Sequence, residues 1–406
     1  MQDHASTMHN GSSWRPAARR VGPAIAILAA GLLLLGGDVL RGTPCASPGP
    51  PSSPSNSPAA SAPEAHRPNV ILVVADDLDV PLYHQLTRLP NIPGGRHFEE
   101  AFVTTPTCCP SKASMLRGQY AHSHGVYGNN PPNGGMARAK ELGIESCTLA
   151  TWLHGAGYET SFIGRYFVGY GWRDVPPSYI PPGWDHWMAR VDKSAAGYQD
   201  IAFSVDGQER TIAGNTDVAS LAEAKRLIAA AGDRPYFMMI AAMAPHWPWP
   251  AVHHSKPSRR AALMAPVEDM VAQLLDTVDD DTYVIFTSDN GFHLTPRAGK
   301  DLPYDTDTRV PLIVWGPGVV PGTDDEHLVA NIDFAPTIAE LAGVRTPDFV
   351  EGQSLVPLLR GEDPAWRAAL TLELVNHWTA TRTATELTVD WADGRHEVLP
   401  VSATLP

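Results

Sequence analysis

The chain has 406 residues, of which 43% are hydrophobic, and a formal net charge of −14. This length is enough for a large buried core, and α/β enzymes often use as much in a single domain. The 44 acidic side chains outnumber the 30 basic ones, and no run of Lys and Arg with interleaved aromatic residues occurs. The composition therefore argues against a nucleic-acid partner.

The amino-terminal segment, residues 1–45, has the features of a targeting signal. Arg15, Arg19 and Arg20 precede an apolar run, Val21 to Gly36. This run is short for a membrane span and fits the core of a signal peptide. An uncleaved signal anchor, which would tether the protein to a membrane, is the alternative. Both interpretations predict a protein outside the cytoplasm, either secreted or membrane-anchored.

Residues 46–66 are almost entirely Pro, Ser and Ala, a composition that predicts a solvated linker. The folded domain is therefore expected to begin near Arg67. It contains three cysteines, Cys108, Cys109 and Cys147, and an odd number in an exported domain suggests one unpaired or chemically special cysteine. A disulfide between Cys109 and Cys147 would leave Cys108 over.

Four apolar segments predict buried strands in an alternating α/β domain, and each is followed by polar side chains. They are Asn69–Ala75 before Asp76 and Asp77, Tyr158–Ile163 before Arg165, Tyr236–Ala242 before His246, and Thr282–Ser288 before Asp289 and Asn290. Ligands of open α/β sheets bind beyond the carboxyl ends of the strands. Carboxylate and amide oxygens suit a hard cation, calcium or magnesium. Asp is also a common cap or turn residue after a strand, but two such strand ends favour a metal site.

The segment Pro106 to Gly118 has the pattern of a loop that enters a helix, with Pro110 in the first turn. Cys108 would then face the unpaired N–H groups and the positive end of that helix, which together stabilise an anion. The alternative is a structural pair of cysteines, Cys108 and Cys109, at a helix start.

Residues 108–112, Cys-Cys-Pro-Ser-Lys, resemble the C-x-P-S-R signature of type I sulfatases, with Lys112 where that family has Arg. Further segments resemble the family in the same order, in a branch similar to glucosamine-6-sulfatases and arylsulfatases: Val70–Asp77, Tyr158–Trp187, Ala244–Pro248, Thr287–Leu294 and Pro303–Pro311. The resemblance implies an alkaline-phosphatase-like α/β fold with a large, mixed, mostly parallel sheet flanked by helices. Residues 67–370 would form this catalytic domain and residues 371–406 an abbreviated antiparallel subdomain.

The resemblance also implies the chemistry. In the family, a formylglycine-generating enzyme converts the signature cysteine, here Cys108, to formylglycine, whose hydrate attacks the sulfur of a sulfate monoester. One calcium ion is bound, and its ligands here would be Asp76, Asp77, modified Cys108, Asp289 and Asn290. The catalytic set would be Cys108, Lys112, Arg165, His246 and Lys300. Lys112 would hold the hydrate oxygen, while His246 and Lys300 would bind sulfate and assist the leaving oxygen. His122 and His124 are candidates for a supporting role, although local hydrogen bonding explains them more simply.

Two basic residues depart from the family pattern in opposite directions. Lys112 replaces an Arg, and Arg165 stands where the family has a sulfate-contacting Lys. Arg and Lys are not equivalent, because Arg offers a planar fork of donors and Lys a compact charge. The Lys112 change bears directly on whether Cys108 is modified. Two alternatives to an active sulfatase stay open: a phosphonate or phosphate ester hydrolase of the same superfamily, and a catalytically degenerate surface binding protein. The substrate is expected to be a sulfated carbohydrate or aryl alcohol.

Overall fold

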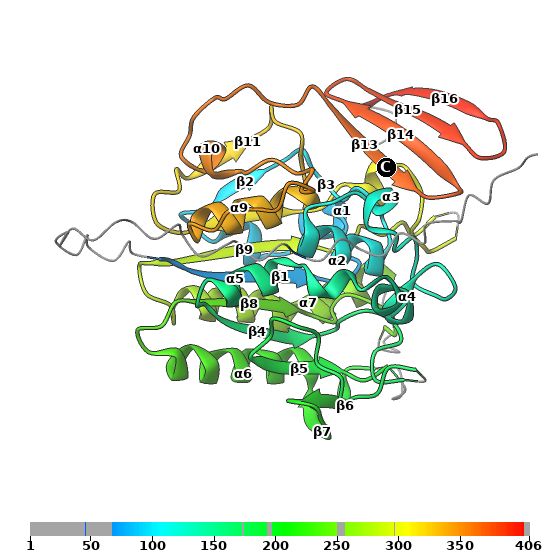
Figure 1. Cartoon of the computed structure of the whole chain (residues 1–406). Helices are drawn as coiled ribbons and strands as arrows, with labels where there is room; N and C mark the ends of the chain where they lie inside the picture. The colour runs from blue at the N-terminus through cyan, green and yellow to red at the C-terminus, as the bar shows by residue number, and fades with distance from the viewer. Residues whose placement is uncertain are drawn as a thin grey trace, which may run out of the picture. The chain divides into compact units, whose positions relative to one another are not determined.

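A ten-stranded sheet organises the described part of the computed structural model, which comprises Cys45 and residues 67–172, 174–192, 197–249, 256–295 and 297–401 (Figure 1). The spatial order of its strands is β11 (Gly322–Asp324), β2 (Arg96–Phe98), β10 (Leu312–Trp315), β9 (Thr282–Ser288), β1 (Asn69–Ala75), β8 (Tyr236–Ala241), β4 (Glu159–Gly164), β5 (His186–Arg190), β6 (Gln199–Val205) and β7 (Gln208–Asn215).

The centre of the sheet is parallel. β1 pairs in parallel with both β8 and β9, and Val70 lies opposite Phe237 on one side and Tyr283 on the other. β4 extends the parallel region between β8 and β5, whereas β10, β6 and β7 run antiparallel to their neighbours. The four strands predicted from apolar runs are confirmed, two with the expected bounds and two with ends shifted by one residue.

The side chains of β1 divide between two hydrophobic cores because successive residues point to opposite faces. Val70, Leu72 and Val74 belong to one core and the alternate residues to the other. The first core includes side chains of α2 (Cys108–Arg117), α4 (Gly135–Leu142), α5 (Leu149–Gly155) and α9 (Phe334–Leu341). The second includes α1 (Val80–Tyr83), α6 (Thr216–Ala231) and α7 (Lys256–Leu275). Burial on both faces explains why this strand is continuously apolar.

A separate four-stranded antiparallel sheet follows the catalytic domain, as predicted. Its strands, in order, are β13 (Ala369–Leu374), β14 (Trp378–Thr383), β15 (Glu386–Trp391) and β16 (His396–Pro400). The alternating apolar residues of β13 and β15 cover a third core, which also contains Phe102 and Leu328 from the catalytic domain. The small sheet is therefore packed on the larger domain through a continuous apolar cluster.

The disulfide that the sequence left possible, between Cys109 and Cys147, does not form. Cys147 is bonded to Cys45, while Cys108 and Cys109 are both free and buried. The Cys109 sulfur instead accepts a hydrogen bond from the backbone N–H of Val168 at 3.2 Å. Cys45 lies before the predicted linker, so the count of three cysteines in the folded domain did not include it. The expectation that Cys108 is unpaired is confirmed.

Apart from Cys45, the predicted signal segment and linker lie outside the described residues. Within the part of the chain that is described, no helix has both the length and the apolar character needed to cross a membrane.

Candidate active site

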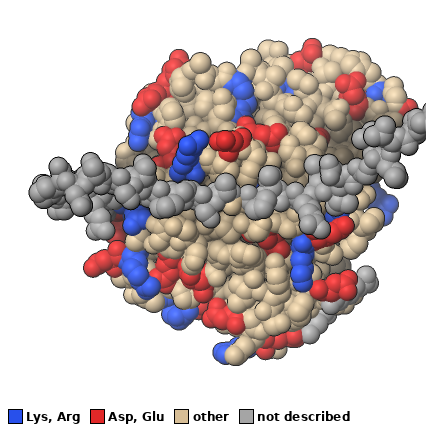
Figure 2. Space-filling model, viewed as in Figure 1, with Lys and Arg blue, Asp and Glu red and all other residues tan. Residues whose placement is uncertain are grey.

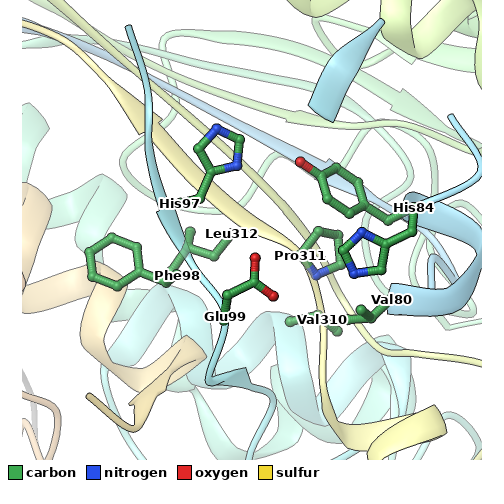
Figure 3. Close-up of a pocket in the computed structure, with 9 residues that line it drawn as sticks. Val80, His84, His97, Phe98, Glu99, Val310, Pro311 and Leu312 are labelled. Atoms are coloured by element: carbon green, nitrogen blue, oxygen red, sulfur yellow. The ribbon is translucent and has the colours of Figure 1, made fainter. Parts of the chain in front are cut away.

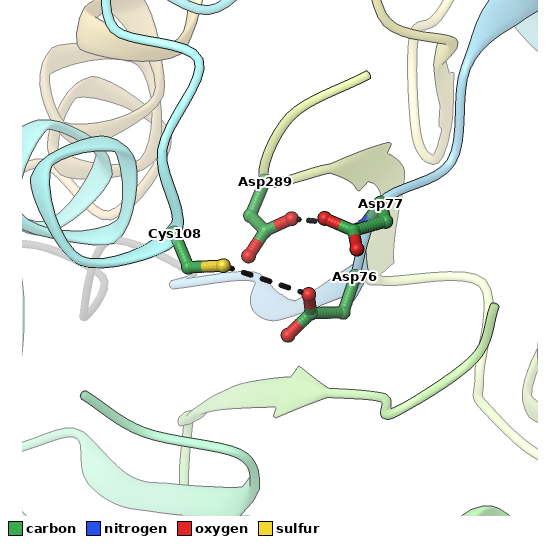
Figure 4. Close-up of side chains that lie close together, drawn as sticks. All are labelled: Asp76, Asp77, Cys108 and Asp289. Carbon is green, nitrogen blue, oxygen red and sulfur yellow. Dashed lines mark hydrogen bonds between the residues drawn. The ribbon is translucent and has the colours of Figure 1, made fainter. Parts of the chain in front are cut away.

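Four buried side chains meet at the carboxyl edge of the large sheet (Figure 4). Asp76 and Asp77 follow β1, Asp289 follows the neighbouring strand β9, and Cys108 is the first residue of α2. One ligand atom from each of the four lies within 4.8 Å of the others. The parallel pairing of β1 with β9 accounts for this meeting, because both strands end at the same edge.

Asn290 lies beside this cluster, as the resemblance implied. Its side-chain nitrogen donates to Asp77 Oδ1 at 2.7 Å, and its oxygen accepts from Lys300 at 3.2 Å. The donor atoms gathered here are thus three carboxylates, an amide oxygen and the Cys108 position, with no imidazole among them. Oxygen-rich sets of this kind fit a hard divalent cation such as Ca²⁺.

Three basic side chains surround the carboxylates. Lys112 lies 2.5 Å from Asp289 Oδ2, Arg165 lies 2.7 Å from Asp76 Oδ2, and Lys300 lies 2.5 Å from Asp77 Oδ1. Burial alone would raise the pKa of Asp76, but Arg165 and Lys112 outweigh it and hold that pKa well below its usual value. The site therefore combines ionised carboxylates, which can bind a cation, with surrounding Lys and Arg side chains, which can bind an anion.

Cys108 is enclosed by this arrangement. Its sulfur lies 2.7 Å from Lys300 Nζ and 3.7 Å from Asp76 Oδ1. Burial, followed by the negative charge of Asp76, raises the pKa of the thiol well above its usual value despite Lys300. The unmodified thiol is therefore a poor source of thiolate, which makes ordinary cysteine nucleophilic catalysis unfavourable here.

His246 also reaches the cluster, with Nε2 3.8 Å from Asp77 Oδ2. Burial lowers the pKa of its imidazole, so the neutral ring is favoured. Its backbone carbonyl accepts a hydrogen bond from the Tyr198 hydroxyl at 2.6 Å. Sequence reasoning missed Tyr198, because a tyrosine directly before β6 gives no sign that it contacts a loop 48 residues later.

His122 and His124 lie away from these groups. His122 contacts Glu373 at 2.9 Å through Nδ1, and His124 Nε2 lies 3.1 Å from the Ser114 hydroxyl. Local hydrogen bonding describes His124, which also accepts from the backbone N–H of Val126. The His122 contact is not local, because Glu373 lies 251 residues later, in β13.

Arg260 of α7 is a second residue that sequence reasoning missed. It is fully buried, forms an ion pair with Asp79 at 2.5 Å, and donates a hydrogen bond to the backbone carbonyl of Asp77. Asp77 has a φ of +69°, a left-handed conformation that is uncommon for a residue other than Gly. Arg260 therefore fixes the turn that carries one of the metal-ligand candidates.

A small pocket elsewhere in the domain contains none of the predicted site residues (Figure 3). Its lining includes Tyr83, His84, His97 and Glu99.

Figure 2 shows acidic and basic side chains interspersed over the face that it draws, with wide uncharged areas between them. Neither the small pocket nor this surface identifies the candidate site, which is defined by the side chains that converge at the carboxyl edge of the large sheet.

The fold and these converging side chains define an α/β enzyme of the alkaline-phosphatase-like class. Residues 68–344 match the family model described as Sulfatase. The chain is 30% identical over 380 residues to the N-acetylglucosamine-6-sulfatase of Capra hircus, covering 78% of this chain and 68% of that protein. It is also 30% identical over 369 residues to the extracellular sulfatase SULF-1 homolog of Drosophila melanogaster. The chain belongs to the sulfatase family, whose enzymes are sulfuric ester hydrolases.

The match to the Drosophila protein covers 74% of this chain but only 32% of that protein, so the chain spans about a third of its length. Among solved structures, BT4656 in complex with its substrate D-glucosamine-2-N,6-O-disulfate has a TM-score of 0.67 at 19% identity, covering 83% of this chain and 92% of the other. The phosphonate monoester hydrolase SpPMH from Silicibacter pomeroyi has a TM-score of 0.64 at 20% identity, covering 82% and 88%. These similarities establish the shared fold.

Proposed function

We propose that this protein hydrolyses sulfate monoesters with a formylglycine hydrate, formed from Cys108, as its nucleophile. The observation that carries the proposal is the position of Cys108, buried between Lys300 at 2.7 Å and the carboxylate of Asp76 at 3.7 Å. A thiol in this position is held neutral, so an oxidised form is needed to supply a competent nucleophile.

In the proposed reaction, one hydroxyl of the hydrate attacks the sulfur, and the alcohol leaves with a proton. The second hydroxyl then loses its proton, the carbonyl re-forms, and sulfate is expelled. Water restores the hydrate. A serine ester would have no second hydroxyl to drive its own release, which explains why an aldehyde is required. The covalent route divides one difficult substitution into two easier steps.

The basic residues have distinct proposed roles. Lys112, buried against Asp289, would hold the hydrate oxygen of the modified Cys108; its burial beside the start of α2 supports this role. Arg165 and Lys300 bind the sulfate oxygens and stabilise the charge that develops on them, and Lys300 also stabilises the leaving oxygen. His246 assists the leaving oxygen. Its Nδ1 lies 2.5 Å from the Trp247 carbonyl, which can only accept, so Nδ1 carries the proton of the neutral ring and Nε2, near Asp77, is an acceptor that donates to the leaving oxygen after taking up a proton.

We propose Ca²⁺ as the bound cation, held by Asp76, Asp77, Asp289, Asn290 and the modified Cys108. When bound, such an ion lowers the pKa of an attacking hydroxyl and neutralises sulfate oxygens. The buried carboxylates of Asp76, Asp77 and Asp289 support it, since one oxygen of each lies within 4.8 Å of the others and of the Cys108 sulfur, the atom that formylglycine would replace with oxygen. Asn290 adds an amide oxygen beside them.

A sulfated carbohydrate is the proposed substrate class, with aryl sulfates as simpler alternatives. Support comes from the names of the glucosamine-6-sulfatase relatives. The name of an extracellular relative and the predicted targeting segment support a location outside the cytoplasm, with secretion or a membrane tether as the two routes.

The first test is the mass of the proteolytic peptide that carries Cys108, in protein purified from its native host. Formylglycine in that peptide, together with calcium-dependent sulfate release that is lost in Cys108→Ala, is the expected result. An unmodified Cys108 would overturn the mechanism. Parallel assays with phenyl phosphonate monoesters address the alternative of a phosphonate hydrolase, which predicts faster turnover of those esters than of sulfates.

A further inference from the structure

The segment that follows Lys300 is fastened to the small four-stranded sheet by three side-chain contacts. The indole N–H of Trp378 donates to the Asp301 carbonyl at 2.9 Å, and the Tyr304 hydroxyl donates to Glu397 at 3.1 Å. The Arg382 guanidinium lies 3.3 Å from the Asp305 carboxylate. All three contacts fall within the five residues after Lys300, so the small sheet fixes this stretch of backbone.

Asp301 links the contacts with the small sheet to the segment that carries Cys108. It has a φ of +82°, and its carboxylate accepts a hydrogen bond from the hydroxyl of Thr107. Thr107 directly precedes Cys108, the first residue of α2. Asp301 is therefore held on one side by Trp378, from the small sheet, and on the other by the residue next to Cys108.

Lys300 has a long side chain and lies in a loop whose described residues form no helix and one isolated bridge, His293 with Gly299. This bridge fixes the backbone before Lys300, and the contacts of Asp301 fix it after Lys300. The ammonium group of Lys300 makes three contacts, 2.5 Å to Asp77 Oδ1, 2.7 Å to Cys108 Sγ and 3.2 Å to Asn290 Oδ1. A flexible side chain can keep several short contacts at once only where its backbone is fixed.

We propose that Trp378 and Asp301 are positioning residues that hold Lys300 against the nucleophile, so that the carboxy-terminal sheet completes the active site. The inference rests on the proposed function, in which Lys300 stabilises the sulfate and the leaving oxygen. It assigns a role in catalysis to a subdomain that contributes none of the predicted site residues.

The test compares Trp378→Phe, which removes the N–H donor, with Trp391→Phe as the matched control. Trp391 lies on β15, packs on the same core, and its buried indole N–H has no partner among the described residues. Both variants are assayed with phenyl sulfate and with 4-nitrophenyl sulfate, whose leaving oxygen needs less stabilisation. We expect Trp378→Phe to lower kcat/KM for phenyl sulfate by about tenfold, the size of one lost hydrogen bond, and for 4-nitrophenyl sulfate by much less. Equal losses with both substrates, or equal losses in the two variants, would overturn the proposal.

Substitution of Asp301 provides a second test. Asp301 is exposed, so the change does not disturb a hydrophobic core. Asp301→Asn keeps an acceptor for Thr107 and tolerates a positive φ, so it should retain activity and bind inorganic sulfate as wild type does. Asp301→Ala should weaken sulfate binding in calorimetry about three- to tenfold and show the same leaving-group dependence as Trp378→Phe. Wild-type affinity in Asp301→Ala would contradict the inference. If the wild-type protein released no sulfate from either ester, that result would contradict the proposed function itself.

Discussion

Lys112 and Arg165 donate to the same oxygen atom, Oδ2 of Asp76, at 3.4 Å and 2.7 Å. These are the two basic residues that differ from those the family resemblance implies, Lys for Arg and Arg for Lys. Their shared partner gives a physical basis for treating the two departures as one coupled change. Lys112 is 1% exposed, so the longer Arg could enter its position only if the neighbouring guanidinium gave way.

The coupling can be measured with Lys112→Arg, Arg165→Lys and the double variant. Each single change crowds or empties the space around Asp76, so each should lower kcat/KM by about tenfold or more, as expected for a perturbed buried charge pair. The double variant restores one Arg and one Lys and should recover most of the activity. The formylglycine content of every variant is measured by mass spectrometry, and rates are normalised to it. Strictly additive losses in the double variant would show that the two positions act independently.

Arg260 should control calcium affinity through the Asp77 turn. Its two terminal nitrogens separately bind Asp79 and the Asp77 carbonyl, and a single ammonium cannot reproduce that fork. Arg260→Lys is therefore expected to keep the charge for Asp79 but weaken calcium binding about tenfold, the effect of one lost charge-assisted hydrogen bond.

Calorimetric titration of calcium into the folded variant measures this directly, with no dependence on turnover. Arg259→Lys, at the neighbouring position of α7, is the matched control and should bind calcium as the wild type does. Unchanged affinity in Arg260→Lys would mean that the Asp77 turn holds its conformation without the guanidinium.

The sequence predicted the centre of the sheet well because strands buried on both faces must be continuously apolar. β1 and β9 matched their predicted bounds, and the carboxylates that follow them meet as expected. Contacts that depend on tertiary packing left no such pattern. Arg260 lies 181 residues from Asp79, and an arginine in a helix normally suggests a solvated face. The Cys45 pairing escaped prediction for a related reason, since its neighbours have the composition of a linker.

Glu145 should make the protein less stable as the pH rises from about 4.5 to 7. Burial raises the pKa of this carboxyl from 4.5 to about 7, although the Tyr166 and Tyr179 hydroxyls oppose the shift by donating to it at 3.0 Å. The folded state then binds a proton that the unfolded state has lost, so the free energy of unfolding falls through this range by about 3 kcal/mol. Below pH 4.5 the group is protonated in both states and the penalty disappears.

Glu145→Gln removes the titrating group and keeps its size. Its stability relative to wild type should rise between pH 5 and pH 8, measured by denaturant unfolding at a series of pH values. Glu141→Gln, at an exposed position of α4, should show no such trend. A difference between Glu145→Gln and wild type that stays constant over this range would show that Glu145 ionises normally in the folded protein.

The Cys45–Cys147 disulfide should contribute measurably to stability, because it joins positions 102 residues apart. Cross-links of long loops typically stabilise a domain by about 2–4 kcal/mol, mainly by restricting the unfolded chain. Cys45→Ser and Cys147→Ser should therefore lower the free energy of unfolding by similar amounts, and the double variant by no more than either. Additive losses would indicate that the two cysteines are not bonded. Mass spectrometry of unreduced peptides checks the bond directly, and a 45–147 cross-link in secreted protein would require any signal cleavage to lie before Cys45.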